Sequence, residues 1–96
     1  MRVPTRQSVR LGDVPSMVRA RLDFSASSNG LVGYTDSQGD YIVKSYGLVI
    51  ACWLEEGDRL WVMDKDDEDI KYESTANHIS YVKQGIDIVR KTLAKV

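Results

Sequence analysis

The sequence predicts an α+β fold in which an antiparallel sheet of four or five strands packs against one C-terminal amphipathic helix. Two observations carry this prediction. Segments rich in β-branched and aromatic residues alternate with turn sequences between residues 17 and 63. The last 22 residues instead carry apolar side chains at helical spacing. We expect residues 17–96 to form one domain, preceded by a basic N-terminal arm at residues 1–16.

The first expected strand covers residues 17–24, where apolar and polar residues alternate. This alternation predicts one apolar face, made by Val18, Ala20, Leu22 and Phe24. The other strands are expected at residues 31–35, 41–46, 48–54 and 59–63.

The near-continuous apolar run at residues 48–54 is typical of a central strand that is covered on both faces. A short extended segment is also expected at residues 70–72. Together with the helix, these strands predict a core made of Leu22, Ile42, Val49, Ala51, Trp53, Leu60, Val62, Ile79, Val82, Ile86 and Val89.

The C-terminal helix is the longest expected element. Ser74 or Thr75 offers a hydroxyl that caps free backbone N–H groups at its start. Apolar residues then recur at spacings of three and four, at Ile79, Val82, Ile86, Val89 and Leu93. This stripe favours packing on the domain's own sheet over a coiled-coil seam, because it spans only about two heptads. Gly85 is expected to permit close packing against the sheet.

Charge is distributed unevenly along a chain whose net charge is only −1. Residues 1–22 carry five arginines and one aspartate, whereas residues 55–73 carry nine acids and three bases. Residues 74–96 are basic again, with four bases and one acid. Faces of opposite sign steer association over about one Debye length, ~8–10 Å in physiological salt.

Composition excludes several classes of protein. No apolar stretch reaches about 18 residues, so we expect neither a transmembrane helix nor a membrane partner. The basic N-terminus is not followed by an apolar run, so no signal peptide is expected. A single cysteine, Cys52, excludes an internal disulfide and is typical of a reducing, intracellular compartment. Because Cys52 lies within an apolar run, we expect it to be a buried small hydrophobe.

Residues 64–69, here called the acidic segment, have two open interpretations. They can form a solvated loop, or a surface that imitates a phosphate backbone and occupies the basic groove of a nucleic-acid-binding protein. The carboxylates of this candidate surface belong to Asp64, Asp66, Asp67, Glu68 and Asp69. The segment lacks the glycine and the terminal glutamate of a calcium-binding loop. Adventitious binding of Mg²⁺ or Ca²⁺ stays open, but no dedicated metal site or other cofactor is expected.

The arginines of the basic arm form a second candidate site. Arg2, Arg6 and Arg10 recur every four residues, which suits a helix face or a flexible arm that contacts phosphates. A sequence pI of about 5.7 weakens this interpretation, since nucleic-acid-binding domains are usually basic as a whole. The aromatic residues on the expected strands favour packing in a core and sheet over a base-stacking platform.

His78 is the single histidine of the chain. It falls in the first turn of the expected helix, where the helix dipole disfavours the imidazolium form. We expect a structural hydrogen-bonding role, because no nucleophile, base and oxyanion-stabilising group can be combined from the sequence. An enzyme is therefore the least favoured class of function, and no catalytic residue is assigned.

Two segments resemble a small domain of unknown function that is common in bacteriophage genomes. The first contains Ser45-Tyr46-Gly47 and then Ile50-Ala51, and the second begins the helix with Ser74-Thr75 and His78. The family pairs a Ser-Tyr-Gly hairpin with a Ser/Thr-Thr-x-x-His helix start, so Ala76 and the long acidic segment depart from its pattern. The resemblance covers roughly the C-terminal 55 residues. It implies a phage or prophage origin and a role for His78 in holding strand and helix together, but no activity.

These observations favour a small phage accessory protein that binds and inhibits a host protein in the host cytoplasm. A nucleic-acid-handling defence enzyme, such as a CRISPR effector, would suit the acidic segment, so the expected role is anti-CRISPR-like. The alternative is a nucleic-acid-binding or regulatory protein that uses the arginines of the arm. A third possibility is a structural phage component. The sequence identifies neither the target nor the host nor the oligomeric state.

Overall fold

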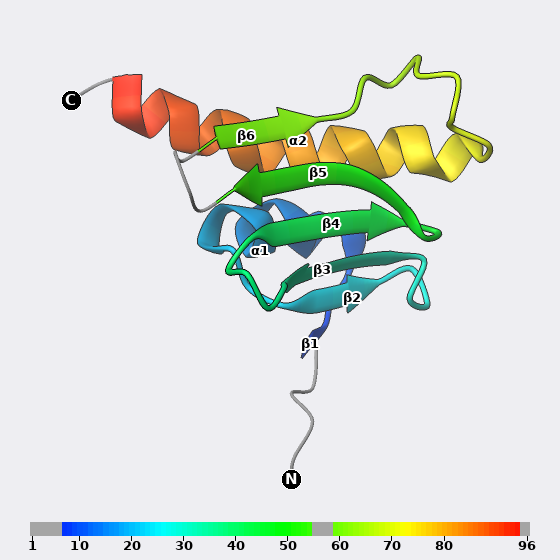
Figure 1. Cartoon of the computed structure of the whole chain (residues 1–96), viewed down its shortest axis with the longest axis horizontal. Helices are drawn as coiled ribbons and strands as arrows, with labels where there is room; N and C mark the ends of the chain where they lie inside the picture. The colour runs from blue at the N-terminus through cyan, green and yellow to red at the C-terminus, as the bar shows by residue number, and fades with distance from the viewer. Residues whose placement is uncertain (1–6, 55–58, 95–96) are drawn as a thin grey trace, which may run out of the picture.

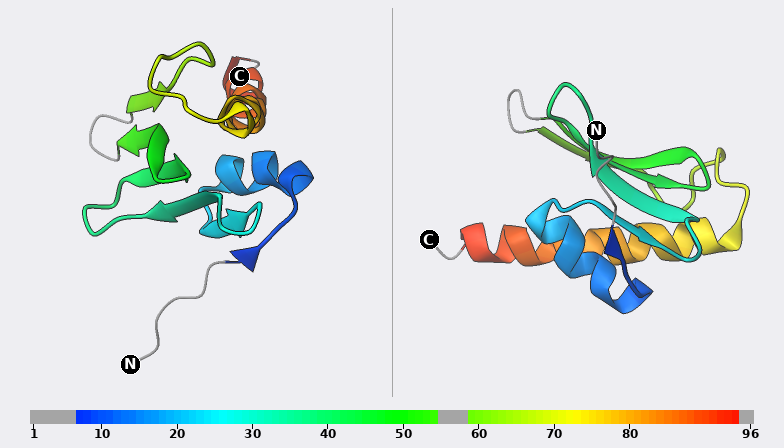
Figure 2. Two further views of the ribbon diagram at one scale, coloured as in Figure 1. Left: turned by 90° about the vertical axis from the view of Figure 1, so that its right-hand side faces the viewer. Right: turned by 90° about the horizontal axis from the view of Figure 1, so that it is seen from below.

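Two helices cover one face of a six-stranded sheet, which confirms the predicted α+β class (Figure 1 and Figure 2). The computed structural model describes residues 7–54 and 59–94, with residues 87–94 described as backbone. The elements in chain order are β1 (Gln7–Ser8), η1 (Leu11–Asp13), α1 (Val14–Ala20), β2 (Phe24–Ala26), β3 (Leu31–Thr35), β4 (Tyr41–Ser45), β5 (Leu48–Leu54), β6 (Arg59–Val62) and α2 (Glu73–Ala94).

The sheet is mixed, so the prediction of four or five antiparallel strands was wrong. The strands lie side by side in chain order, and β1 pairs with β2 in parallel. The other neighbouring pairs, from β2–β3 to β5–β6, are antiparallel. A parallel pair requires a crossover connection, which α1 supplies here. A strand of two residues such as β1 is too short to leave a periodic pattern in the sequence.

The expected strand at residues 17–24 was also wrong, because residues 14–20 form α1. Val14, Met17 and Val18 are buried at helical spacing. Pro15 lies in the first helical turn, where its missing N–H costs nothing. The alternation of residues 17–24 therefore reflected a short helix followed by a turn.

The end of α1 explains why Leu22 is not in the core. Arg21 adopts a left-handed conformation with φ of 54° and ends the helix. The chain then turns away, so the Leu22 side chain is 49% exposed. Of the four residues predicted to share a strand face, only Phe24 lies in a strand.

The described part of the N-terminal arm is integrated into the fold. Residues 7–8 form β1, and the Val9 N–H donates a hydrogen bond of 2.9 Å to the Ser25 carbonyl. Val14 and Pro15 are buried in α1. Residues 7–16 are thus part of the folded domain, while residues 1–6 lie outside the described residues.

The core lies between the sheet and the helices. Five predicted core residues are buried there, namely Ala51, Trp53, Ile79, Val82 and Ile86. Leu60 and Val62 are partly buried against this core. The side chain of Val89 lies outside the described part of the chain.

Ile42 and Val49 were wrongly placed in the core. In β4 the buried side chains are Tyr41, Val43 and Ser45, so the alternation of a strand sends Ile42 to the opposite face. Ile42 and Val49 are half-buried on that face, which the helices do not cover (Figure 2). β5 is therefore covered on one face only, and not on both as its apolar run indicated.

α2 packs on α1 and on β5, as expected for a helix of the domain's own core. Gly85 permits a close approach to Pro15 of α1 rather than to the sheet, since a Cβ atom at Gly85 would lie 2.5 Å from the Pro15 carbonyl oxygen. Residues 70–72 form no strand. Neither α1 nor α2, across the residues described, has the length and apolar character that a membrane crossing requires.

Candidate functional site

The β4–β5 turn, the β2–β3 loop and the start of α2 meet at one end of the molecule (Figure 1). A backbone hydrogen bond of 2.7 Å from the Tyr46 N–H to the Gly30 carbonyl joins the turn to the loop. The segment from β6 to α2, which contains the acidic segment, reaches the same end (Figure 1). Residues far apart in the sequence therefore share this region.

A buried polar network joins β4 to α2. Ser45 Oγ lies 2.8 Å from His78 Nδ1 and 2.9 Å from Thr75 Oγ1. These three side chains are at most 2% exposed. A hydroxyl carries one proton and accepts others, so Ser45 can donate to one neighbour and accept from the other. The network holds the end of the strand against the first turns of the helix, which agrees with the structural role expected for His78.

The β2–β3 loop closes the other side of the imidazole. Ser27 Oγ lies 3.5 Å from His78 Nε2. Ser27, Ser28 and Asn29 all have positive φ, at 51°, 53° and 71°. Such conformations are uncommon for residues with a Cβ atom, and serine and asparagine tolerate them better than bulky residues. The loop thereby places a hydroxyl beside a ring nitrogen that would otherwise be buried without a partner.

The environment of His78 favours its neutral form. Burial lowers the pKa of His78 below its ordinary value of 6.5. α2 begins at Glu73, so His78 lies in the second helical turn and not in the first as expected. Desolvation, and not the helix dipole, is thus the cause of the lowered pKa.

The β4–β5 turn presents a tyrosine in a rare conformation. Tyr46 and Gly47 are the two loop residues, with φ of 50° and 84°. Positive φ at both positions is the geometry of a two-residue type I′ hairpin, in which asparagine and glycine are usual and tyrosine is not. The Tyr46 ring packs against Tyr72 with a centroid distance of 4.8 Å, and Ser74 donates a hydrogen bond of 3.0 Å to its hydroxyl. These contacts hold an aromatic side chain at the surface in one orientation.

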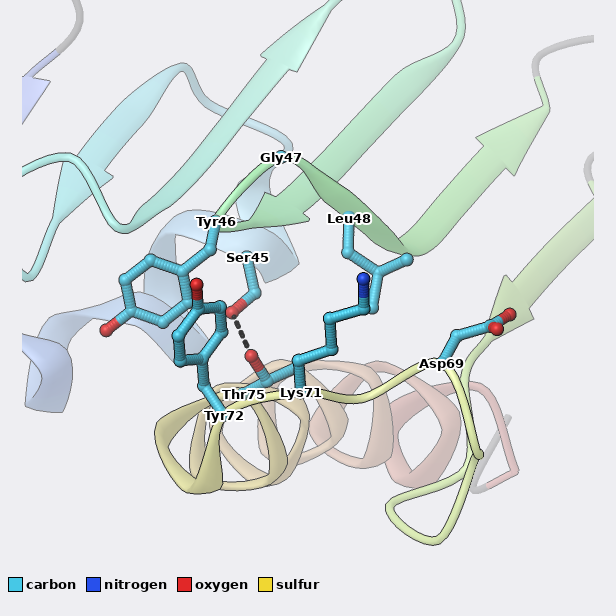
Figure 3. Close-up of a pocket in the computed structure, with 8 residues that line it drawn as sticks. All are labelled: Ser45, Tyr46, Gly47, Leu48, Asp69, Lys71, Tyr72 and Thr75. Atoms are coloured by element: carbon cyan, nitrogen blue, oxygen red, sulfur yellow. Dashed lines mark hydrogen bonds between the residues drawn. The ribbon is translucent and has the colours of Figure 1, made fainter.

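A small pocket opens beside the buried network (Figure 3). Its volume is about 250 Å³, and it is lined by Ser45, Tyr46, Gly47, Leu48, Asp69, Lys71, Tyr72 and Thr75. Figure 3 shows the Lys71 side chain extending toward Leu48, while the Asp69 carboxylate points away from the Lys71 side chain. Ligand pockets usually measure about 300–1,000 Å³, so this pocket suits one amino-acid side chain better than a cofactor.

The acidic segment forms a turn-stabilised loop beside this pocket. The Asp67 carboxylate accepts a hydrogen bond of 2.8 Å from the Asp69 N–H, and the Asp67 carbonyl accepts one of 3.1 Å from the Ile70 N–H. Asp67 is half-buried, whereas the carboxylates of Asp64, Asp66, Glu68 and Asp69 are exposed. The structure therefore brings an acidic surface and two exposed tyrosines, Tyr46 and Tyr72, to the same end of the molecule.

The Ser45–His78 contact has the spacing of a nucleophile and its general base. Both side chains are only 1% exposed, however, so a substrate cannot reach the Ser45 hydroxyl in this conformation. All buried side-chain nitrogen and oxygen atoms in the described residues have hydrogen-bond partners. Nor do the described residues contain a cluster of three or more histidines, cysteines or carboxylates that could hold a metal ion. The burial of the three side chains favours a structural role for the network, which joins β4 to α2.

The second candidate site is not brought together in the described structure. Arg10 is exposed at the start of η1, whereas Arg2 and Arg6 lie outside the described residues. Cys52 is a free cysteine on the uncovered sheet face. It is half-buried there, so the prediction that it lies buried in the core was wrong. Burial and then the nearby carboxylates of Asp40 and Asp36 raise the pKa of its thiol, which keeps it a poor nucleophile.

Comparison of the chain with protein-family models, with curated proteins and with solved structures found no match.

Sequence reasoning missed the residues that frame the pocket, Tyr46, Lys71 and Tyr72. The sequence did contain a signal for this region. The hairpin Ser45-Tyr46-Gly47 and the helix start Ser74-Thr75 with His78 are the two segments that carry the resemblance described above. In the structure these segments contact each other through the serine, the tyrosine and the histidine. Their pairing is a requirement of packing between strand and helix.

Proposed function

We propose that this chain is a small phage accessory protein that binds and inhibits a nucleic-acid-handling host protein through its acidic segment. The carrying observation is that the exposed residues Asp64, Asp66, Glu68 and Asp69 lie at the same end of the molecule as the exposed rings of Tyr46 and Tyr72, and Asp69 lines the same pocket as both tyrosines. The phage origin in this proposal rests on the resemblance of the two segments.

The physical basis is a combination of charge and aromatic anchors. Carboxylates on a loop held by its own hydrogen bonds can occupy the groove in which a host protein binds phosphates, and so exclude the nucleic acid. Exposed tyrosines with few rotatable bonds contribute large contact area at low entropic cost, and aromatic residues dominate many interfaces. The adjacent pocket can accept one side chain of the partner.

A pull-down from host lysate with the full chain as bait tests the proposal, with nuclease treatment in one arm. We expect one protein to be retained stoichiometrically after nuclease treatment. A variant with Asp66→Asn, Glu68→Gln and Asp69→Asn should lose it, because charge is removed while Asp67 still holds the turn. Tyr46→Asn should weaken retention, since asparagine tolerates the positive φ but lacks the ring.

Control variants separate folding from binding. Ser37→Ala lies in an exposed turn away from this end and should retain the partner fully. Circular dichroism and thermal unfolding should show that the variant with Asp66→Asn, Glu68→Gln and Asp69→Asn, here called the charge variant, still folds. Undiminished capture by the charge variant would exclude the acidic segment as the binding surface. Recovery of nucleic acid, or of partners that nuclease removes, would instead favour the arginines of the arm.

A further inference from the structure

β6 forms the upper border of the sheet in Figure 1. β5 is its only strand neighbour among the described residues. One side of its backbone therefore presents N–H and C=O groups without a strand partner, which is a template for another extended chain. Natural proteins protect such borders with charge or with a covering element, yet β6 contains one charged residue, Arg59.

An exposed tryptophan lies on this border. Trp61 is 48% exposed and pairs directly with Cys52 on the sheet face that the helices leave uncovered. A shallow hollow of about 380 Å³ is lined by Cys52, Leu54, Arg59, Leu60 and Trp61. Because alternate side chains of a strand point to the same face, an added strand would place every second side chain over this hollow. Tryptophan in such a position is the residue type that most often dominates binding energy.

The charge around β6 indicates the kind of chain that would pair with it. Residues 55–73, which include β6, carry nine acids and three bases. A second copy of this protein placed border to border would bring two such stretches together, and like charges would repel. A chain rich in lysine or arginine would instead gain attraction from the acidic segment that directly follows β6.

We propose that β6 binds a basic, extended segment of a partner protein as an added strand. Alternate apolar side chains of that segment pack on Trp61, and its basic side chains face the acidic segment. This inference rests on the proposed function, since it specifies the part of the partner that is recognised. The main-chain hydrogen bonds of strand addition supply affinity, and the hollow and the charges supply selectivity.

Titration of the isotope-labelled full chain with a capped peptide of alternating lysine and valine tests the proposal by NMR. We expect shifts of the Arg59–Val62 amides and the Trp61 indole, with slower hydrogen exchange in β6. A peptide of the same composition with all lysines before all valines should bind at least about tenfold more weakly, because it cannot alternate across the border. An alternating glutamate–valine peptide should not bind.

Trp61→Ser should weaken binding of the alternating peptide by about tenfold without unfolding the chain, since the side chain is already half exposed. Tyr34→Ser is the matched control. Tyr34 occupies the same row of the sheet through Ile42 and Cys52, three strands or about 14 Å away. This variant should bind the peptide as the wild type does.

Equal affinity for the alternating and the block peptide, with shifts confined to residues 64–69, would overturn the proposal, as would an unaffected Trp61→Ser variant. The proposed function would still stand in those cases if the charge variant lost its lysate partner. Conversely, a charge variant that kept its lysate partner would contradict the proposed function, whatever the peptide titration showed.

Discussion

His78 shows how one buried polar residue can connect three segments of a chain. Its ring nitrogens face Ser45 of β4 and Ser27 of the β2–β3 loop, while its backbone belongs to α2. A buried polar group that loses its partner destabilises a protein by about 1–3 kcal/mol. The network therefore stabilises the contact between β4 and α2, because separating them while these groups stay buried would leave a nitrogen or a hydroxyl without its partner.

The lowered pKa of His78 predicts a pH dependence of stability. The unfolded chain takes up a proton near the ordinary pKa of 6.5, whereas the folded chain does so only at lower pH. The contribution is fully present above pH 6.5 and is lost as the pH falls through the lowered pKa. His78→Gln should be less stable than the wild type at neutral pH, by about 1–3 kcal/mol. It should lose less stability than the wild type on acidification.

Urea unfolding of both proteins above and below about pH 6.5 measures this difference. Carboxylates elsewhere titrate in both proteins, so the difference between the two curves isolates His78. Parallel pH profiles in the two proteins would show that His78 does not titrate differently on folding.

At the scale of elements, the contact between α1 and α2 depends on a glycine. A Cβ atom at position 85 would lie 2.5 Å from the Pro15 carbonyl oxygen and 3.2 Å from two further Pro15 backbone atoms. Backbone atoms cannot move aside as a flexible side chain can. The two helices would have to separate to accommodate any larger residue.

Gly85→Ala should therefore destabilise the protein by about 1–3 kcal/mol through overpacking. This outcome opposes intrinsic helix propensity, by which alanine would gain about 1 kcal/mol over glycine. Chemical denaturation of the variant, with Gln84→Ala as an exposed control on the same helix, measures the effect. A more stable Gly85→Ala protein would show that the helices are not in close contact.

At the scale of the whole molecule, the acids are concentrated in one stretch of the chain, which includes the acidic segment. The chain has a net charge of −1, yet residues 55–73 alone carry nine acids and three bases. Such a distribution is of little use for stability, because neighbouring carboxylates repel each other in the folded state. The binding surface that we propose would account for this concentration of acids.

Self-repulsion within the acidic segment predicts that added salt stabilises the wild-type protein. The variant with Asp66→Asn, Glu68→Gln and Asp69→Asn should be slightly more stable than the wild type at low salt and should respond less to added salt. Urea midpoints of the two proteins at low and high sodium chloride test this expectation. A wild type that salt does not stabilise relative to the variant would show that these carboxylates are too far apart to repel each other.

Local periodicity determined the positions of most elements, but not that one face of β5 is left uncovered. α2 and the strands β3 to β6 follow from period and turn residues, and Ile79, Val82 and Ile86 are buried as their spacing indicates. The exposure of the acidic residues on a loop follows equally from composition. Local sequence is enough to predict these features, because they depend mainly on residues that are neighbours along the chain.

Tertiary packing decided the remaining features. The helical state of residues 14–20 depends on burial against α2, and the addition of β1 depends on a partner that lies 17 residues away at Phe24. The pairing of Ser45 with His78, the ring contact of Tyr46 with Tyr72 and the uncovered sheet face arise from segments that meet only in the folded chain. Sequence patterns indicate which side chains avoid water. Which segment packs against each of those side chains depends on the arrangement of the whole chain.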